Sequence, residues 1–407
     1  MPGNLRDRLK RIQNVQRGEV KKPGNGNAAD LPGWDSAGYL TLKREVVESG
    51  AVAAPLKMPE AAGIVMPGIN SGTAYGDLLF FDLETSGLSG GAGTVAFLAA
   101  FGRLVPQKSE KEKTIHDLHI TQYLLLDYPG ESDFVGAMAA EINKGGTIVS
   151  YNGKSFDSQI LKTRCLMNGI KTPEYRHADL LHPARRLWKR LLPDCSQGTI
   201  EQRILGIDRT DDIPGAMAPD IWFSFLRNGE TGPLLGICEH NRRDIAGLAS
   251  LFSAMAAVAA DPIKAAEKFN YDFEALALYW HDVTRKYDAG NGAQGLRLRE
   301  EGRRLLRHAA ETGGARAMLR YALVLLKTEK HDDGREWLLK TAGLHDDAGI
   351  WQALALRALA IDSEHRLGNA TEALSLAEQA LELLRDASSL RNDFERRVQR
   401  LRKKLNN

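Results

Sequence analysis

The sequence predicts an α/β domain, in which helices flank a mixed β-sheet, followed by an all-α domain of helical repeats. Three stretches at 78–81, 94–101 and 115–126 are apolar, β-branched or aromatic, as in strands. After them, strand-like and helix-like segments alternate to about residue 258, which is typical of a sheet covered by helices. Beyond about residue 270 every segment is helical and rich in Ala and Leu.

The elements between and after these strands follow the same patterns. Residues 130–143 predict a helix capped near Ser132, residues 147–152 a short buried strand, and residues 155–169 a helix that ends at a glycine. Helical patterns then dominate, at 179–192, 196–206, 218–229 and 234–257.

Composition places the chain among ordinary soluble proteins. Its 407 residues are 43% hydrophobic and 26% charged, and the net charge of +2 does not indicate a particular class of partner. Three scattered cysteines exclude a disulfide framework and a CxxC zinc site. The apolar run at 251–260 is too short to cross a bilayer, and no apolar signal core follows the N-terminus. We therefore expect a cytoplasmic protein without a membrane partner.

Four regions follow from these patterns. We expect a basic, loosely ordered N-terminal arm at 1–75, a mixed α/β domain at 76–260, a helical domain at 270–385 and a basic C-terminal tail at 386–407. Basic blocks of this kind are usually solvated, and contact with nucleic acid is the alternative.

The helical domain carries hints of a repeat. Gly368, Ala373 and Ala380 have the spacing of a tetratricopeptide turn glycine and its small crossing residues. Ala317, Tyr321 and Ala342 match this pattern less well, so a generic helical bundle is the alternative. In either case this region is expected to be a scaffold for packing or for a protein partner.

Two acids end the first buried strand. Asp82 and Glu84 are two residues apart, so in a strand they point to the same face and repel each other. Burying such charges without partners costs several kcal/mol. A cation is expected beside them.

Later segments offer further acids for the same place. Asp157 lies just after the strand at 147–152, where a helix cap is the alternative role. His240 and Asp244 are four residues apart on one face of a helix, whose alternative role is a solvated surface. If the four carboxylates converge, their charge of about −4 favours two divalent ions, and oxygen ligands favour Mg²⁺ or Mn²⁺ over zinc.

The segments that hold these acids resemble a known group of nucleases. "FDLETSGL", "YNGKSFD" and "HNRRDI" are similar, in order and spacing, to the three exonuclease motifs of the DEDD superfamily, which has the ribonuclease-H-like fold. "HADLLHPARRLW", "CSQGTIEQRILGIDR" and "DIPG" resemble the YprB-type ribonuclease-H-like family, whose members also carry a tetratricopeptide-like region. The nuclease resemblance covers about residues 76–255.

This resemblance implies roles for the acids and for one histidine. Asp82, Glu84, Asp157 and Asp244 match the four metal-binding acids, and Asp82 would bridge both ions. The superfamily places a tyrosine four residues, or a histidine five residues, before the last Asp, whereas here His240 occupies the tyrosine spacing. His240 is expected to orient or deprotonate the attacking water, and a structural hydrogen bond is the alternative.

Substrate contacts are also implied. Thr85, Ser86 and Gly87 would approach the terminal nucleotide, and a phosphate or base would be contacted by Asn152, Lys154 and Phe156. His177 and Asp179 would support the site, with capping of the next helix as the alternative.

The function expected from the sequence is a two-metal-ion 3′–5′ exonuclease that hydrolyses single-stranded DNA or RNA. Two alternatives stay open: an inactive or weak nuclease-fold adaptor that binds protein or nucleic acid through its helical repeats, and a structure-selective endonuclease.

Overall fold

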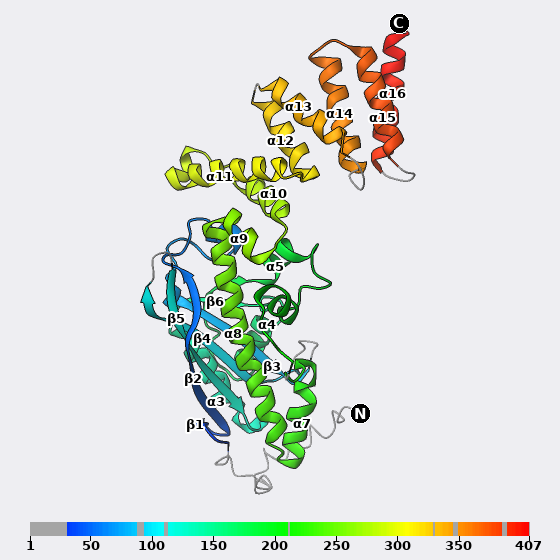
Figure 1. Ribbon diagram of the computed structural model, residues 1–407. Coiled ribbons are helices and arrows are strands. Elements are labelled where there is room, and N and C mark those ends of the chain that lie inside the picture. Colours follow the sequence, from blue (N-terminus) through cyan, green and yellow to red (C-terminus); the bar gives the residue numbers. More distant parts are fainter. Residues whose placement is uncertain are drawn as a thin grey trace. The chain divides into compact units, whose positions relative to one another are not determined.

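The computed structural model describes residues 31–87, 93–109, 113–210, 212–328, 330–344, 349–384 and 389–406. The chain divides into two compact units, Met1–Tyr271 and Asp272–Asn407 (Figure 1). The first unit holds a sheet with helices, and the described residues of the second unit that have regular structure are helical.

The sheet of the first unit has seven strands among the described residues, in the order β1-β2-β5-β4-β3-β6-β7. Neighbouring strands from β1 to β3 in this order are antiparallel, whereas β6 is parallel to β3 and β7 is parallel to β6. The strands are β1 (Asp35–Gly38), β2 (Thr41–Pro55), β3 (Leu78–Thr85), β4 (Ala96–Ser109), β5 (Lys113–Leu125), β6 (Thr147–Ser150) and β7 (Arg176–Asp179). The predicted mixed sheet is confirmed.

The described residues before β3 differ from the expected loosely ordered arm. β2 pairs with β5 from Thr41 opposite Leu125 to Pro55 opposite Lys113, and β1 adds an edge strand to it. Polar residues such as Glu45 and Glu48 interrupt the apolar alternation of β2, because much of this strand is exposed. Because of these polar residues, the sequence pattern does not predict β2. Residues 1–30 of the expected arm lie outside the described residues.

β7 is a second element that the sequence pattern did not predict. Its four residues, "RHAD", contain one apolar side chain, so they carry no periodic signal. β7 pairs in parallel with β6, from Thr147 opposite Arg176 to Ser150 opposite Asp179. The pairing brings Asp179 to the end of β6, where the chain leaves the sheet.

Helices cover both faces of the sheet (Figure 1). Phe80 of β3 contacts Phe252 of α8, with ring centroids 5.8 Å apart, whereas Phe81 stacks on Phe101 in the cluster that includes α3. The α-helices of this unit among the described residues are α2 (Ala62–Val65), α3 (Glu131–Asn143), α4 (Asp157–Met167), α5 (Leu181–Trp188), α6 (Gln197–Ile200), α7 (Ala218–Asn228), α8 (Gly232–Ala260) and α9 (Pro262–Phe269). α3 begins after Gly130 without a side-chain cap, so the cap predicted near Ser132 is wrong.

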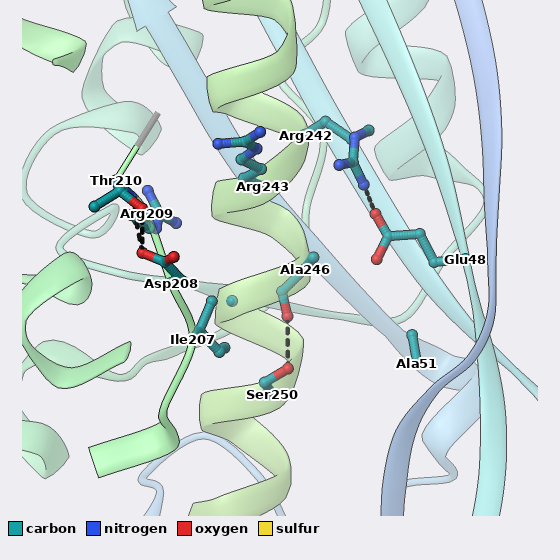
Figure 2. A pocket seen from close by; sticks show the side chains of 11 residues that line it. Glu48, Ala51, Ile207, Asp208, Arg209, Thr210, Arg242, Arg243, Ala246 and Ser250 are labelled. Carbon is teal, nitrogen blue, oxygen red and sulfur yellow. Dashed lines mark hydrogen bonds and ion pairs between the residues drawn. The ribbon is translucent and has the colours of Figure 1, made fainter. Parts of the chain in front are cut away.

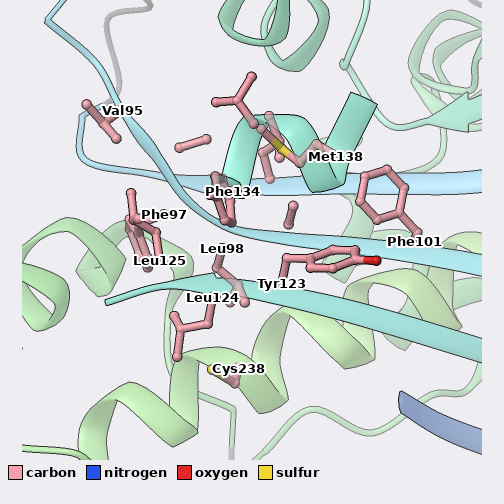
Figure 3. Packing of buried hydrophobic residues seen from close by; sticks show 14 of the residues in the cluster. Val95, Phe97, Leu98, Phe101, Tyr123, Leu124, Leu125, Phe134, Met138 and Cys238 are labelled. Carbon is pink, nitrogen blue, oxygen red and sulfur yellow. The ribbon is translucent and has the colours of Figure 1, made fainter. Parts of the chain in front are cut away.

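The core between the sheet and α3 is aromatic and fully packed. Phe134 and Met138 of α3 lie with Phe97, Phe101 and Tyr123 of the central strands (Figure 3). Burial of each such side chain stabilises the fold by roughly 1.5–3 kcal/mol, so this core holds β3 and β4 rigidly. The rigid strands in turn position the acids at the end of β3.

The long helix α8 packs against β2, β3, β4 and β5 on the other face. A Cβ on Gly102 would lie 2.5 Å from Cγ2 of Ile245, so this glycine lets α8 approach β4 closely. α8 has 29 residues, and an 18-residue window with a mean hydropathy of 1.3 is 61% buried. Its apolar composition is thus explained by packing on the sheet.

The described helices of the second unit are α10 (Phe273–Thr284), α11 (Gly292–Glu311), α12 (Ala315–Lys327), α13 (His331–Ala342), α14 (Gly349–His365), α15 (Ala370–Leu383) and α16 (Ser389–Leu405). Consecutive helices contact each other, as in a helical stack. Ala373 and Ala380 are fully buried, and Gly368 has a φ of +67° in the turn before α15. The tetratricopeptide-like character of this region stays a prediction.

Candidate metal centre

Three distant segments bring the predicted acids together on the α8 face of the sheet. Asp82 and Glu84 follow Phe80 at two-residue intervals on β3, so all three side chains share the face that α8 covers. Burial raises the pKa of Asp82 well above its usual range, and Asp244, Asp157 and Glu84 raise it further. The four carboxylates therefore lie within electrostatic reach of one another.

The pKa values of Glu84 and Asp157 are raised as well. Burial, followed by the charges of Asp244, Asp157 and Asp212, raises the pKa of Glu84 well above its usual range. Burial and the neighbouring Asp179 raise the pKa of Asp157 to about 7. Burial and the neighbouring negative charges thus disfavour the charged forms of these carboxylates.

The turn before α4 is shaped to deliver Asp157. Asn152 has a φ of +65°, and a Cβ on Gly153 would lie 2.5 Å from Oγ of Ser150 and 2.9 Å from Oδ2 of Asp157. The glycine therefore allows the chain to fold back over the end of β6. Asp157 is the first residue of α4 and is buried, and no side-chain cap precedes it.

Asp179 and His177 of β7 support this turn. Asp179 accepts hydrogen bonds from the backbone amides of Asn152 at 2.8 Å and Lys154 at 3.0 Å, and also from Leu181 at 3.0 Å. The last contact is at the start of α5. Asp179 thus bonds both to the turn before Asp157, which is the expected supporting role, and to the start of the next helix, which is the alternative role. His177 Nε2 lies 2.7 Å from Oγ of Ser150, and its Nδ1 lies 3.2 Å from Oγ of Ser158. Burial lowers the pKa of His177 to about 4, so this bridge between β6 and α4 is neutral at pH 7.

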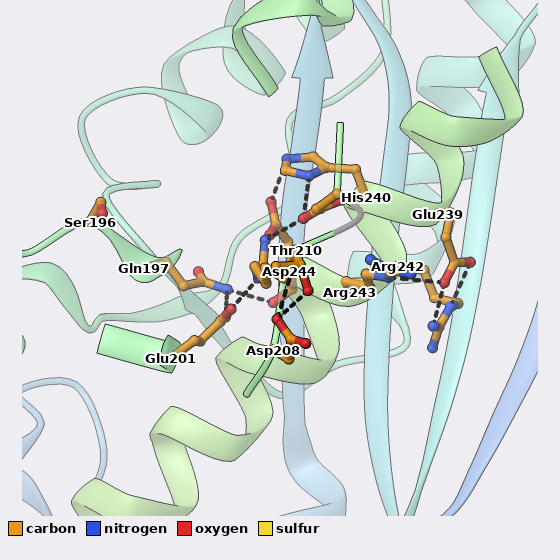
Figure 4. Close-up of polar contacts among 12 residues, drawn as sticks. Ser196, Gln197, Glu201, Asp208, Thr210, Glu239, His240, Arg242, Arg243 and Asp244 are labelled. Carbon is orange, nitrogen blue, oxygen red and sulfur yellow. Dashed lines mark hydrogen bonds and ion pairs between the residues drawn. The ribbon is translucent and has the colours of Figure 1, made fainter. Parts of the chain in front are cut away.

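His240 points its Nε2 atom at the acids. Nε2 lies 3.3 Å from Oδ2 of Asp244 (Figure 4). It lies 3.9 Å from Oε1 of Glu84. One ligand atom from each of Glu84, His240 and Asp244 lies within 4.8 Å of the others, so these three residues could hold a metal ion. The four-residue spacing on α8 thus places the imidazole beside the last acid.

A second group of charged residues, which sequence reasoning missed, surrounds Asp244. Arg209 Nη1 lies 2.6 Å from Oδ1 of Asp244 and 3.0 Å from Oδ2 of Asp212, and Arg209 also pairs with Glu201. Glu201 begins the π-helical turn η4 (Glu201–Leu205), and burial raises its pKa to about 7 although Arg209 lowers it. Only the segments "CSQGTIEQRILGIDR" and "DIPG", quoted for their resemblance, marked this region in the sequence.

The buried side-chain amides of Gln122 and Asn241 form a chain of hydrogen bonds that ends at Asp82. Asn241 Nδ2 donates to Oδ2 of Asp82 at 2.8 Å. Gln122 Nε2 donates to Oδ1 of Asn241 at 2.9 Å, and its own oxygen accepts from Arg44. Because each amide has one donor end and one acceptor end, this order leaves the NH₂ of Asn241 facing Asp82. The chain orients Asp82 before any metal binds.

The hydroxyl groups at the end of β3 and in the loop that follows form hydrogen bonds within this segment and with Val95. Thr85 Oγ1 donates to the carbonyl of Gly87 at 2.9 Å, and Ser86 Oγ accepts from the amide of Val95 at 3.0 Å. Thr85 and Ser86 are buried, so their hydroxyls brace the loop. Residues 88–92, which continue this loop, lie outside the described residues.

The predicted substrate residues at the start of α4 divide into two kinds. The side chains of Asn152 and Lys154 are exposed beside the acids, whereas Phe156 is half-buried and packs against the core. Lys154 therefore presents a positive charge to solvent in this turn. Contacts of all six predicted substrate residues with nucleic acid stay predictions.

A groove of about 500 Å³ runs along the outer side of α8 (Figure 2). Glu48 and Ala51 of β2 line one wall, and Ile207–Thr210 line the other. Arg242 pairs with Glu48 and Glu239, and Arg243 lies 3.3 Å from Glu239. The positive charges of Arg242 and Arg243 are thus partly balanced by Glu48 and Glu239.

The mixed sheet with its helices is consistent with a ribonuclease-H-like fold. Residues 79–256 match the family described as the RNase_H superfamily. A relative from Bacillus subtilis (strain 168), described as "Uncharacterized protein YprB", is 38% identical over 182 residues, which are 44% of this chain. The matched part spans 42% of that relative, less than half of its length.

A solved structure is also similar in part. The family B DNA polymerase of the archaeon Pyrobaculum calidifontis is 11% identical, with a TM-score of 0.32 over 51% of this chain and 29% of the polymerase. A similarity at this level does not define a fold or a function.

The donor set fits a hard divalent cation. Asp82, Glu84 and Asp157 have raised pKa values because they are buried and lie near other carboxylates, which for Asp157 is Asp179, and a divalent ion would relieve both effects. Carboxylate oxygens suit Mg²⁺ or Mn²⁺, and one imidazole is compatible with Mn²⁺. The residues that would hold metal are Asp82, Glu84, Asp157 and Asp244, with His240 at the edge.

Proposed function

We propose that the ribonuclease-H-like domain is a metal-dependent 3′–5′ exonuclease that hydrolyses phosphodiester bonds in single-stranded DNA or RNA. The observation that carries the proposal is the convergence of four carboxylates and His240 from β3, α4 and α8. The resemblance of the three segments to the DEDD motifs favours the 3′–5′ direction. The cytoplasmic location expected from the sequence is part of this proposal.

Two Mg²⁺ or Mn²⁺ ions bound by the acids would polarise the phosphodiester and stabilise the charge that develops on it. The protein's part is to hold the acids fixed. Asn241 orients Asp82, and Arg209 holds one oxygen of Asp244 so that the other faces Glu84 and His240. Little rearrangement is then needed when metal and substrate bind.

His240 is the proposed proton acceptor or water-orienting group. Its Nε2 faces the space between Glu84 and Asp244, where an attacking water would lie. An imidazole suits this task because its ordinary pKa is near neutrality. The helix spacing that differs from the histidine pattern of the superfamily therefore still brings Nε2 to the acids.

Phosphate contacts are proposed for the turn before α4. Lys154 and Asn152 are exposed there, one turn of chain from Asp157. A cation beside the acids would hold the phosphate of the terminal nucleotide without adding to the desolvation cost of the cluster. The helical second unit is proposed to bind a protein partner.

The experiment is degradation of 5′-labelled single-stranded DNA and RNA oligonucleotides by the full chain with Mn²⁺ or Mg²⁺. Asp82→Asn and Glu84→Gln should each lower the rate by more than roughly 100-fold, since groups that merely orient metal ligands already contribute 10- to 100-fold. Glu174→Gln, an exposed acid in the same unit, is the matched control and should cleave like the wild type. Activity that survives both cluster substitutions would overturn the site.

Substrate ends separate the modes of cleavage. A 3′–5′ exonuclease shortens the 5′-labelled strand stepwise and leaves circular single strands intact. Cleavage of circles would instead assign an endonuclease, and a chain that binds oligonucleotides but cleaves none with either metal would be an adaptor.

A further inference from the structure

Four residues form a row across the sheet, one on each of the neighbouring strands β2, β5, β4 and β3. Arg44 of β2 lies opposite Gln122 of β5. Ala100 of β4 lies opposite Gln122 on one side and opposite Asp82 of β3 on the other. Opposite residues of antiparallel strands share a face, so all four side chains point to the face that α8 covers.

Asn241 of α8 connects the two polar residues that flank Ala100 in this row. Gln122 and Asp82 are two strands apart, about 10 Å, which is too far for a direct hydrogen bond. Asn241 accepts from Nε2 of Gln122 at 2.9 Å and donates to Oδ2 of Asp82 at 2.8 Å. The four polar residues thus form one hydrogen-bond chain, Arg44–Gln122–Asn241–Asp82, which runs from β2 to the acids.

We propose that Gln122 is a positioning residue for Asp82, which acts through Asn241 and takes its direction from Arg44. The proposal rests on the nuclease function proposed above. β2 lies before residues 79–256, the part of the chain that matches the RNase_H superfamily. The site thus includes a strand from outside the matched part.

The guanidinium of Arg44 fixes the direction of the hydrogen-bond chain because it only donates. The side-chain oxygen of Gln122 accepts from its Nε at 3.0 Å and also from its Nη2. Gln122 must therefore donate onward with its NH₂, which it does to Asn241 and to the carbonyl of Cys238. The oxygen of Asn241 is then engaged, and its NH₂ faces Asp82. In the reverse direction, a carbonyl oxygen would face the carboxyl group.

The hydrogen-bond chain is protected from water. Gln122 and Asn241 are fully buried. Arg44 is half-buried, and its guanidinium carbon lies 5.2 Å from the centre of the Trp34 ring. Water therefore competes little for these hydrogen bonds, and an amide turned the wrong way would leave buried polar atoms unpaired. The direction is thus set by the fold, before any ion or substrate binds.

Three substitutions test the hydrogen-bond chain at different points. Gln122→Glu keeps the shape but introduces a carboxylate that only accepts, so Asn241 has to turn its NH₂ toward β5 and its oxygen toward Asp82. Arg44→Met removes the donors of the guanidinium and keeps an apolar stem beside Trp34. Arg44→Lys is the conservative variant, because its ammonium group can still donate to Gln122.

The first readout is the side-chain NH₂ of Asn241 in the metal-free full chain. ¹H–¹⁵N correlation spectra of ¹⁵N-asparagine-labelled protein show its pair of signals, which is the pair lost in Asn241→Leu. Asp82→Ala should shift this pair in the wild-type background, because the NH₂ donates to Asp82 there. The same substitution should shift the pair much less in the Gln122→Glu background, because the NH₂ then faces β5.

The second readout is the affinity of the full chain for Mn²⁺, measured by calorimetry. Gln122→Glu should weaken binding by roughly 10- to 100-fold, the range for residues that orient metal ligands. Arg44→Met should weaken it by a smaller factor, since the carbonyl of Cys238 still accepts from Gln122. Arg44→Lys should match the wild type. The direction of the change is decisive, because an added negative charge or a lost positive charge by itself strengthens cation binding.

Two controls carry the same changes of charge outside the hydrogen-bond chain. Gln107→Glu adds a negative charge at an exposed position of β4, and Lys43→Met removes a positive charge next to Arg44 on β2. Neighbouring residues of a strand point to opposite faces, so Lys43 lies outside the row. Neither control should weaken Mn²⁺ binding. Urea unfolding verifies that each variant is folded, and if Gln122→Glu is not, the two variants of Arg44 decide.

Two results would overturn the positioning role of Gln122. One is unchanged or tighter Mn²⁺ binding in Gln122→Glu, and the other is an equal shift of the Asn241 signals in both backgrounds. Arg44→Met with wild-type affinity would overturn the role of Arg44. If the wild type cleaves no oligonucleotide and binds no Mn²⁺, the proposed function fails instead, and the spectra still decide whether Gln122 directs Asn241 toward Asp82.

Discussion

At the scale of single residues, the buried acids of the cluster lower the stability of the metal-free fold. Burial and three like charges raise the pKa of Asp82, and similar forces act on Glu84 and Asp157. Residues chosen only for folding would be apolar or paired at these positions. The unfavourable charges are what a divalent cation would bind to.

Asp157→Asn tests directly whether a buried carboxylate of the cluster destabilises the metal-free protein. Removing the charge should raise the unfolding free energy of the metal-free protein at pH 8 by roughly 1–3 kcal/mol, because a buried, repelled carboxylate is lost. The same variant should lose Mn²⁺ binding. Urea unfolding and calorimetry measure the two effects, with Glu174→Gln as the control. A variant that is less stable than wild type would contradict the assigned repulsion.

How far the sequence predicts the site depends on whether a residue's partners are local. Asp82 with Glu84, and His240 with Asp244, have spacings that place them on one face of a strand or helix, so their convergence could be anticipated. Arg209 and Asp212 lie in an irregular segment whose path is set by tertiary contacts. No spacing rule covers such a segment, so they could be found only in the structure.

At the scale of elements, α8 and the turn η4 depend on a missing side chain. A Cβ on Gly247 of α8 would lie 1.7 Å from Oε1 of Glu201, which begins η4. The glycine lets Glu201 reach Arg209 and lets Gln197 donate to the carbonyl of Asp244 at 2.7 Å. The contact between these two elements holds the arginine beside the acids.

Gly247→Ala should therefore destabilise the protein by about 1–3 kcal/mol through overpacking. The direction is informative because alanine in a helix is ordinarily favoured over glycine by about 0.5–1 kcal/mol. Gly232→Ala, at the first residue of the same helix, has open space and should not destabilise the protein. Denaturant unfolding of the two variants checks this, and equal stabilities would contradict the packing.

Elements were predictable where their pattern was strong. The apolar strands and the helices around α4 and α8 stand out because their periodicity reflects burial on one face. β2 was missed because much of it is exposed, and β7 because four residues carry no period. Both strands are defined by pairing with distant chain segments, which a local pattern does not record.

At the scale of the whole molecule, the acid cluster couples stability to pH. Asp157 has a pKa of about 7 in the folded protein, against an ordinary value of 3.8. Between these values the folded state holds a proton that the unfolded chain has released. The metal-free unfolding free energy should therefore fall as pH rises from about 4 to about 7, by roughly 1–4 kcal/mol from this group. Urea unfolding across that range, compared with Asp157→Asn, isolates its contribution; equal pH slopes in the two proteins would contradict the assigned pKa.

At high pH, bound metal should restore the unfolding free energy that the metal-free protein loses. Mn²⁺ at about 100 times its dissociation constant would stabilise the folded state by about 2.7 kcal/mol. Thermal unfolding at pH 8 should show an upward shift of Tm with Mn²⁺ in the wild type and none in Asp82→Asn. An equal shift in both proteins would mean that the ion binds elsewhere.

Anomalous diffraction from crystals grown with Mn²⁺ tests most directly whether these acids form a divalent metal centre. We predict Mn²⁺ peaks among the carboxylates of Asp82, Glu84, Asp157 and Asp244, at ligand distances of roughly 2.0–2.3 Å. A cluster without a peak at a Mn²⁺ concentration that supports cleavage of oligonucleotides would contradict the account.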